Sequence, residues 1–193
     1  MTAMWKPILG IIMFGFILAA CASHGVATSQ TSSTQSSNGS LKFSAPAEWI
    51  SEKPTSNMRI AQYKLPKVAG DQEDATLVVY YFGQGQGGTS AANIERWVNQ
   101  MQQPDGGQSK DRARESSQTI NGLKVDTVDI SGTYTAEMAP GSGTFNNKPN
   151  FRMKAAVVET PKGSYFIKLV GPEKTIISQD QPFANFLKSL EFK

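Results

Sequence analysis

Side chains that commonly carry chemistry are scarce in this sequence of 193 residues. Cys21 is its only cysteine and His24 its only histidine, and both lie near the N-terminus. A single thiol allows neither an internal disulfide nor a cysteine-based zinc site, and a Ser-His-Asp mechanism needs an imidazole held in a folded domain. The sequence therefore predicts no metal site, no cofactor and no catalysis by thiol or histidine.

Carboxylates are the remaining groups that could catalyse a reaction. Two acids suffice for glycoside hydrolysis when they flank the scissile bond. Asp71, Glu73 and Asp74 lie close together, but their polar neighbours indicate a solvated turn and their spacing does not fit a calcium loop. No residue is predicted to be catalytic, although a carboxylate-dependent hydrolase stays open as an alternative.

Residues 83–88 contain a G-x-G-x-x-G pattern between a predicted strand and a predicted helix. Glycines at such a place let a pyrophosphate approach a helix N-terminus. No apolar strand follows within a short βαβ unit, and the acidic residue about 20 positions on, Asp105, lies in a polar loop. We therefore interpret the pattern as a flexible connection and not as a nucleotide site.

The N-terminal segment has the order of a secretory signal. Lys6 provides a positive charge, residues 7–18 are mostly apolar, and small side chains precede Cys21. This order holds the charge at the cytoplasmic face and presents small residues to a peptidase. An uncleaved anchor helix is the alternative, but the apolar run is short and interrupted by glycines.

The motif Leu18-Ala19-Ala20-Cys21 resembles the lipobox of bacterial lipoproteins at every position. The resemblance implies that residues 1–20 are a lipoprotein signal peptide and that acylated Cys21 becomes the first residue of the mature protein. Ala22 and Ser23 follow, without an aspartate at the second mature position. By resemblance to Gram-negative sorting, this implies a lipid anchor in the outer membrane, with the protein facing the periplasm.

Residues 21–40 are rich in Ser, Thr and Gln and carry almost no charge, which predicts a flexible tether. The remaining residues, 41–193, are enough for a single domain with its own core. After Lys6 leaves with the signal, 18 of the 19 basic residues and all 16 acidic residues remain, a net charge of +2. So balanced a charge does not predict a nucleic-acid partner.

Within residues 41–193, the pattern predicts strands joined by hairpins and two amphipathic helices. Residues 75–82 form the strongest predicted strand, because both of its alternating faces are apolar and each must be covered by a further layer. A second helix is predicted to begin near Asp180, with Pro182 in its first turn. The first helix, capped by Thr89 or Ser90, has one apolar stripe formed by Ile94, Trp97, Val98 and Met101.

Three local signals concern the segment between the helices. Residues 108–117 are polar and predict a solvated loop. Asn121-Gly122 predicts a hairpin turn, because both residues tolerate positive φ. The alternation of apolar residues slips between Val125 and Val128, which predicts a bulge or a bend.

A binding surface is predicted at the loop formed by residues 139–150, because long loops in compact domains are often functional. The residues expected to contact a partner are Phe145, Asn146, Asn147 and Lys148. A loop that merely lengthens a hairpin is the alternative. Aromatic residues on the strands could line a groove as well, but core packing is their commoner role; they are Trp49, Tyr80, Tyr81, Phe82 and Tyr134.

From about residue 41 onward, the chain resembles the PsbP/Mog1/DcrB-like domains. The resembling features are the Ala45-Pro46-Ala47-Glu48-Trp49 opening, the helix around Trp97, the paired strands before Gly171-Pro172, and the closing segment with Phe183, Phe186-Leu187 and Leu190-Glu191-Phe192. The resemblance implies an α+β fold, an antiparallel sheet with helices packed on it as a PsbP/Mog1-like sandwich.

Members of that fold perform unrelated tasks, so the fold by itself assigns no function. The favoured function is a non-catalytic envelope lipoprotein that is held to the membrane by its lipid and binds an envelope protein or a small ligand. The alternative is a carboxylate-dependent hydrolase that acts on envelope glycan.

Overall fold

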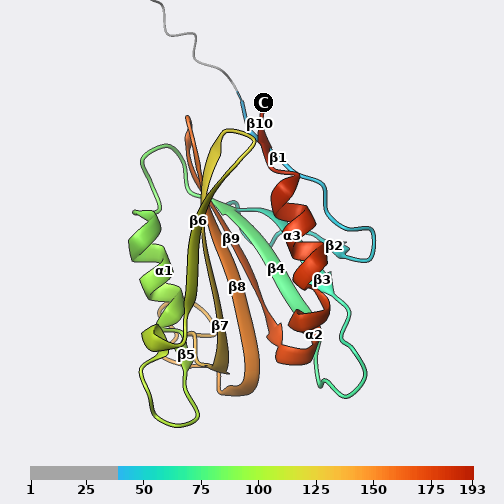
Figure 1. Ribbon diagram of the computed structural model, residues 1–193, viewed down its shortest axis with the longest axis vertical. Coiled ribbons are helices and arrows are strands. Elements are labelled where there is room, and N and C mark those ends of the chain that lie inside the picture. The colour runs from blue at the N-terminus through green and yellow to red at the C-terminus, as the bar shows by residue number, and fades with distance from the viewer. Residues whose placement is uncertain (1–38) are drawn as a thin grey trace, which may run out of the picture. The chain divides into compact units, whose positions relative to one another are not determined.

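The computed structural model describes residues 39–193, which belong to one compact unit (Figure 1). The predicted signal peptide, Cys21 and nearly all of the predicted tether lie outside the described residues. Along the described chain, no helix has the length and apolar character needed to cross a membrane. The elements are β1 (Leu41–Lys42), β2 (Ile50–Glu52), β3 (Arg59–Leu65), β4 (Ala75–Tyr81), α1 (Ser90–Val98), β5 (Met101–Gln102), η1 (Ser109–Asp111), β6 (Arg114–Ile120), β7 (Leu123–Tyr134), β8 (Lys148–Thr160), β9 (Gly163–Pro172), α2 (Glu173–Ser178), α3 (Asp180–Lys188) and β10 (Glu191–Phe192).

One antiparallel sheet of eight strands organises the domain. Its order is β2-β3-β4-β9-β8-β7-β5, and β6 also pairs with β7. The strands β6 and β7 are joined at Asn121 and Gly122, whose φ angles of 49° and 81° confirm the predicted hairpin turn. A separate ribbon of β1 and β10 brings the two ends of the described chain together.

Helices cover both faces of the sheet: α1 lies on one face, and α2 and α3 lie on the other (Figure 1). The central strand β4 contributes Leu77 and Val79 to the hydrophobic cluster beneath α3, whereas Tyr80 packs against the cluster beneath α1. This confirms that both faces of the strand are covered, as its apolar alternation predicts. The α+β class, an antiparallel sheet with helices packed on it, is likewise confirmed.

The core beneath α3 is built around Phe186, which is fully buried. Its ring lies 5.3 Å from the ring of Trp49 and 5.2 Å from that of Phe43, between centroids. The indole Nε1 of Trp49 donates a hydrogen bond to Oε1 of Gln179 at 2.7 Å. The segment that opens the domain is therefore fastened to its closing helix by aromatic packing and a buried hydrogen bond.

The start of α1 explains one of the glycines in the G-x-G-x-x-G pattern. Thr89 caps the helix, since its Oγ1 accepts a hydrogen bond from the backbone N–H of Ala92 at 3.2 Å. Just before it, Gly87 has a φ of 90°, and a Cβ there would lie 2.5 Å from the ring of Phe166. At this position the interpretation as a flexible connection is wrong: the glycine allows close packing of the backbone on a core ring.

The prediction of a loop at residues 108–117 is also wrong in part. Residues Ser109–Asp111 form a 3₁₀ turn and Arg114–Ile120 form the strand β6. Nearly every side chain of β6 is exposed, so the strand carries no apolar alternation that would reveal it. Polar pairs across the ladder hold it instead, such as Ser117 with Asp126 at 2.6 Å between Oγ and Oδ1.

Two further expectations need correction. The register of β7 against β8 is continuous from Lys124 to Gly132 and shifts only between Gly132 and Tyr134. Val125 packs in the hydrophobic cluster on one face of the sheet and Val128 in the cluster on the other face. Because β7 is buried on both faces, the change in the apolar alternation requires no bulge. The loop expected at 139–150 ends early, because β8 begins at Lys148.

Candidate ligand-binding cleft

A cleft of about 420 Å³ lies on the face of the sheet that carries α1. Its floor is made by strands β3, β4, β9 and β7, one wall by the C-terminal part of α1, and the other by the segment between β7 and β8. We call it the α1 cleft. Its lining consists of Arg59, Tyr80, Phe82, Arg96, Trp97, Gln100, Tyr134, Ala136, Glu137, Met138, Pro140, Asn146, Phe166 and Lys168.

Aromatic rings form the floor of the α1 cleft. Tyr80 of β4 and Phe82, which directly follows the strand, both line the cleft, as the alternation of side chains along extended chain predicts. Their rings are nearly parallel, with an interplanar angle of 7° and centroids 6.0 Å apart. The ring of Phe82 in turn lies 5.4 Å from that of Phe166, and Trp97 closes the floor from α1. Phe166 and Trp97 are buried, so the ring surface that a ligand can reach belongs mainly to Tyr80 and Phe82.

Three cationic side chains border this floor: Arg59, Arg96 and Lys168. The guanidinium of Arg59 lies 5.6 Å from the ring centroid of Tyr80 and donates to Oε1 of Gln62 at 2.7 Å. Arg96 donates to Oδ1 of Asn93 at 2.5 Å. Within residues 39–193, none of the three cations forms an ion pair with a carboxylate.

Lys168 is the most unusual of the three cations. It projects from β9, a central strand, and its Nζ donates to Oε1 of Gln100 at 2.5 Å and to Oη of Tyr134 at 3.1 Å. The same Nζ lies 4.9 Å from the ring centroid of Tyr134. Burial, together with the charge of Arg96, lowers the pKa of Lys168 to about 7. Neutral acceptors hold this ammonium, and no negative charge compensates it.

Tyr134 shares this environment. Burial, together with neighbouring Tyr80, raises the pKa of its phenol to about 12. The phenol is therefore neutral at physiological pH and supplies an oxygen acceptor without supplying a charge. It positions the Lys168 ammonium at the floor of the cleft without neutralising it.

The wall between β7 and β8 is held in shape by its own hydrogen bonds. Glu137 accepts from the backbone N–H of Gly143 at 2.7 Å and from that of Gly141 at 2.9 Å. These two bonds lower the pKa of the carboxyl group. Asn146 donates through its backbone N–H and its Nδ2 to the carbonyl of Ala136, at 2.9 and 2.8 Å. Both oxygens of the one carboxylate in the lining are thus engaged by the loop.

Known proteins with a similar fold are distant in sequence. A chain from Mycobacterium tuberculosis, LpqN, described as involved in cell envelope biogenesis, is 10% identical with a TM-score of 0.50; the match covers 80% of this chain and 84% of LpqN. A protein of unknown function from Pseudomonas aeruginosa matches at 13% identity and a TM-score of 0.45, over 78% of this chain and 96% of its own. The cyanobacterial PsbP of Synechocystis matches at 12% identity and a TM-score of 0.45, over 91% and 99%. No model of a protein family matches the sequence, and no curated protein matches it. These likenesses concern the fold alone.

The structure places the predicted loop residues in different surroundings. Asn146 lines the α1 cleft, and Phe145 lies at the outer surface with 63% of its area exposed. Asn147 is exposed as well. Lys148 belongs to β8, where its Nζ lies 2.5 Å from Oε2 of Glu73 and 5.5 Å from the ring centroid of Phe151. Of the four, only Asn146 contributes to the cleft.

The aromatic residues considered for a groove divide between two roles. Trp49 and Tyr81 belong to the cluster beneath α3, as core packing predicts. Tyr80, Phe82 and Tyr134 line the α1 cleft. The sequence did not predict any of the three cations as binding residues. Only Lys168 has an unusual sequence context, because it is a charged residue between the apolar residues of an otherwise buried strand.

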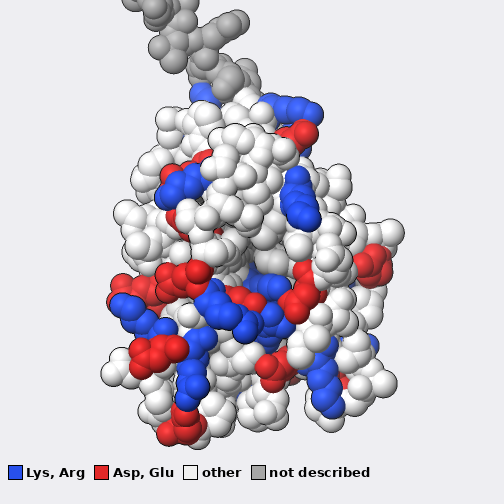
Figure 2. Space-filling view, viewed as in Figure 1, with Lys and Arg blue, Asp and Glu red and all other residues white. Residues whose placement is uncertain are grey.

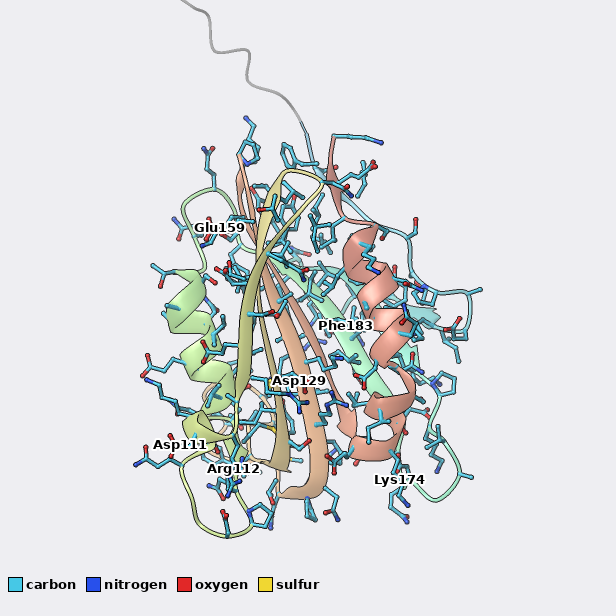
Figure 3. The ribbon with its side chains drawn as sticks, viewed as in Figure 1. Asp111, Arg112, Asp129, Glu159, Lys174 and Phe183 are labelled. Atoms are coloured by element: carbon cyan, nitrogen blue, oxygen red, sulfur yellow. The ribbon has the colours of Figure 1, made fainter. Side chains whose placement is uncertain are left out.

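Carboxylates gather on the opposite face of the sheet. Asp129 of β7 accepts from Nε and Nη2 of Arg152 at 2.7 and 2.6 Å, and Asp180 accepts from Nη1 of the same arginine at 3.1 Å. Lys154 also pairs with Asp180, and its Nζ lies 5.6 Å from the ring centroid of Phe183. Figure 2 shows both signs of charge meeting in the middle of this face, and Figure 3 labels Asp129 and Phe183 there.

This charged network suits a structural role better than a catalytic one. Burial raises the pKa of Asp129, but the hydrogen bonds and charge of Arg152 outweigh it and the pKa is lowered. A general acid for glycoside hydrolysis needs the opposite, a raised pKa. The part of the chain that is described contains no group of three or more His, Cys, Asp or Glu side chains placed to hold a metal ion.

The acidic turn at residues 71–74 is built into the fold. Asp71 accepts from the backbone N–H and the hydroxyl of Thr175, at 2.8 and 2.6 Å, and so caps the start of α2. Asp74 accepts from the backbone N–H of Lys67 at 2.9 Å. These carboxylates hold loops in place, in contrast to the solvated turn that the sequence indicates.

Proposed function

We propose that this protein is a non-catalytic, lipid-anchored envelope protein whose folded domain binds a small ligand in the α1 cleft. The observation that carries the proposal is the cleft's uncompensated charge: three cations border an aromatic floor, and none pairs with a carboxylate among the described residues. Its volume of about 420 Å³ falls within the range of about 300–1,000 Å³ that is usual for small-molecule sites.

A partly buried lysine without a counter-ion does not stabilise a fold, because desolvation disfavours its charged form. Strongly perturbed pKa values of this kind cluster at binding and catalytic sites. The network around Arg152 is different, since each of its charges has an opposite partner. The binding function therefore has more support than the hydrolase, for which the described carboxylates provide no evident proton donor.

The envelope location is part of the same proposal. It is supported by the lipobox-like Leu18-Ala19-Ala20-Cys21 motif, which implies acylation of Cys21 and an anchor in the outer membrane. The fold shared with LpqN, a protein involved in cell envelope biogenesis, is compatible with it. A Cys21→Ser variant is expected to remain an unprocessed precursor and to leave the mature membrane-bound form absent. Normal processing and an unchanged membrane fraction would refute the anchor.

Binding can be tested on residues 21–193 carrying Cys21→Ser, so that no detergent is needed. A library of small fragments, charged and neutral, is screened by NMR, and the amide shifts are mapped onto the structure. We expect the bound fragments to perturb amides of β4, β9 and the end of α1. Hits confined to other surfaces, or no hits at millimolar concentration, would refute the cleft as the binding site.

A further inference from the structure

The charges of the α1 cleft do not balance. Arg59, Arg96 and Lys168 face the one carboxylate of the lining, Glu137. Both oxygens of that carboxylate are already bound to the backbone N–H groups of Gly141 and Gly143. The carboxylate keeps its charge, but the loop holds it, and among the described residues it forms no ion pair with any of the three cations.

Arg96 and Lys168 line the same cleft from α1 and β9. The charge of Arg96 also contributes to the lowered pKa of Lys168. Like charges held near each other repel, and an anion between them removes that repulsion. A single carboxylate, sulfonate or phosphate group satisfies this requirement, because each offers several oxygens to the donors of a lysine and an arginine.

The apolar part of the lining consists mainly of rings. Tyr80 and Phe82 present nearly parallel faces, and Phe166 and Trp97 lie beside them. Flat aromatic ligands stack on such rings in offset or tilted geometry and gain more than their buried area alone would give. Flexible alkyl chains would gain only the burial and would also lose rotamer freedom.

We infer that the α1 cleft takes a small aromatic anion, with its ring system against Tyr80 and Phe82 and its anionic group between Lys168 and Arg96. This inference rests on the proposed function, a small ligand bound in this cleft, and adds the chemical class of that ligand. Arg59 completes the site by flanking the ring of Tyr80.

Three probes of similar size separate the elements of the inference. Naphthalenesulfonate is an aromatic anion, naphthalenesulfonamide is its nearly isosteric neutral counterpart, and octanesulfonate is an aliphatic anion. Their binding to the mature-length Cys21→Ser chain is measured by isothermal titration calorimetry at pH 6. We expect naphthalenesulfonate to bind at least about tenfold more tightly than naphthalenesulfonamide, a ratio typical of one well-placed charge-assisted contact. Against octanesulfonate, which has the same charge but no ring to stack, we expect a preference of about three- to tenfold.

Variants then locate the anionic group. Lys168→Met and Arg96→Gln are each expected to weaken naphthalenesulfonate by about fivefold or more and to leave naphthalenesulfonamide unchanged. Arg96 is exposed, so its replacement keeps the test informative even if Lys168→Met perturbs folding. Lys148→Met is the matched control, because it also removes one lysine charge but lies outside the cleft lining.

The outcomes distinguish the inference from the function beneath it. Equal affinity for the sulfonate and the sulfonamide, or insensitivity to both variants, overturns the anionic part of the inference while cleft binding stands. Equal affinity for octanesulfonate overturns the aromatic part. Failure of all three probes to bind at millimolar concentration overturns the inference and, together with a negative fragment screen, the proposed function as well.

Discussion

Replacing Lys168 with methionine should make the domain more stable near neutral pH and less stable at high pH. Methionine has a similar length and keeps the apolar contacts of the lysine stem, but it carries no charge. In the folded protein the pKa of Lys168 is lowered to about 7, chiefly by burial. The unfolded chain binds its proton up to a pH of about 10.5. Between these two values the unfolded state therefore holds more protons, and the wild-type stability rises with pH.

The size of the effect follows from the same two values. A difference of about 3.5 pKa units corresponds to about 4–5 kcal/mol of destabilisation, fully present below pH 7 and almost gone at pH 10. Against this gain, the variant leaves Gln100 and Tyr134 without their donor, which costs about 1–1.5 kcal/mol each. The net expectation is a gain of about 2 kcal/mol at pH 7 and a loss of about 1–2 kcal/mol at pH 10.

Urea unfolding of the two proteins from pH 6 to pH 10 measures this difference directly, provided that the slope with denaturant is unchanged. At pH 7 the melting temperature should rise by about 4–8 °C. The two stability curves should cross between about pH 8 and pH 9.5, where the relieved desolvation equals the lost hydrogen bonds. Lys148→Met removes only a half-exposed ion pair and should change stability by less than about 1 kcal/mol.

A Lys168→Met variant that is less stable than wild type at every pH would refute the reasoning. It would mean that the hydrogen bonds to Gln100 and Tyr134 outweigh the desolvation of the ammonium. Parallel stability curves without a crossing would equally show that the proton of Lys168 is not released near neutral pH.

Three further perturbations test other parts of the structure. Affinity for naphthalenesulfonate, measured by calorimetry, should fall about five- to tenfold between pH 6 and pH 8.5, because Lys168 in the unbound protein has a pKa of about 7 and loses its charge in this window. The pH dependence should vanish in Lys168→Met. A wild-type affinity that does not change with pH would contradict the prediction. The groups that face Lys168 in the cleft are Arg59, Tyr80, Arg96, Tyr134 and Glu137. Arg152→Met should lower the free energy of unfolding by about 3 kcal/mol at pH 7, because it leaves Asp129 charged and half enclosed; urea unfolding should show much of this loss recovered by adding Asp129→Leu. Gly87→Ala should lower the free energy of unfolding by at least about 2 kcal/mol, because the new Cβ would lie 2.5 Å from the ring of Phe166 and the backbone φ at this position is 90°. A melting temperature equal to that of the wild type would show that the ring can move aside.

Much of the fold is predictable from local patterns. The two apolar faces of residues 75–82 require layers on both sides, and the structure supplies α1 on one and α3 on the other. The apolar stripes of α1 and α3, the hairpin at Asn121-Gly122 and the cap at Thr89 follow in the same way from spacing and turn chemistry. The strand β6 could not be foreseen, because its side chains are polar and its hydrogen bonds to β7 are the contacts that order it.

The α1 cleft was less accessible to prediction, because its parts come from distant segments. Arg59 is on β3, Arg96 on α1, Tyr134 on β7 and Lys168 on β9, and only the strand order β3-β4-β9-β8-β7 and the packing of α1 bring them together. In the sequence most of these residues have an ordinary explanation, such as a surface arginine or a core tyrosine. The pairing register of strands that are distant in the sequence decides whether such a residue lies at the surface, in the core or in the cleft.

Lys168 is the residue of the cleft whose unusual environment could be predicted from the pairing of the strands. The strand β9 reads Gly163–Pro172, and its neighbours in the sheet are strands on both sides, so an inward lysine cannot reach open solvent from an edge. A lysine in such a strand needs a carboxylate partner or has a lowered pKa. The cross-strand neighbours of Lys168 are Val78 and Ala155, which offer no charge. Had the register been known, the missing counter-ion would have identified the cleft before any side chain was placed. The proposed ligand site therefore depends on a central-strand lysine without an acidic neighbour, a feature that can be recognised once the pairing of the strands is known.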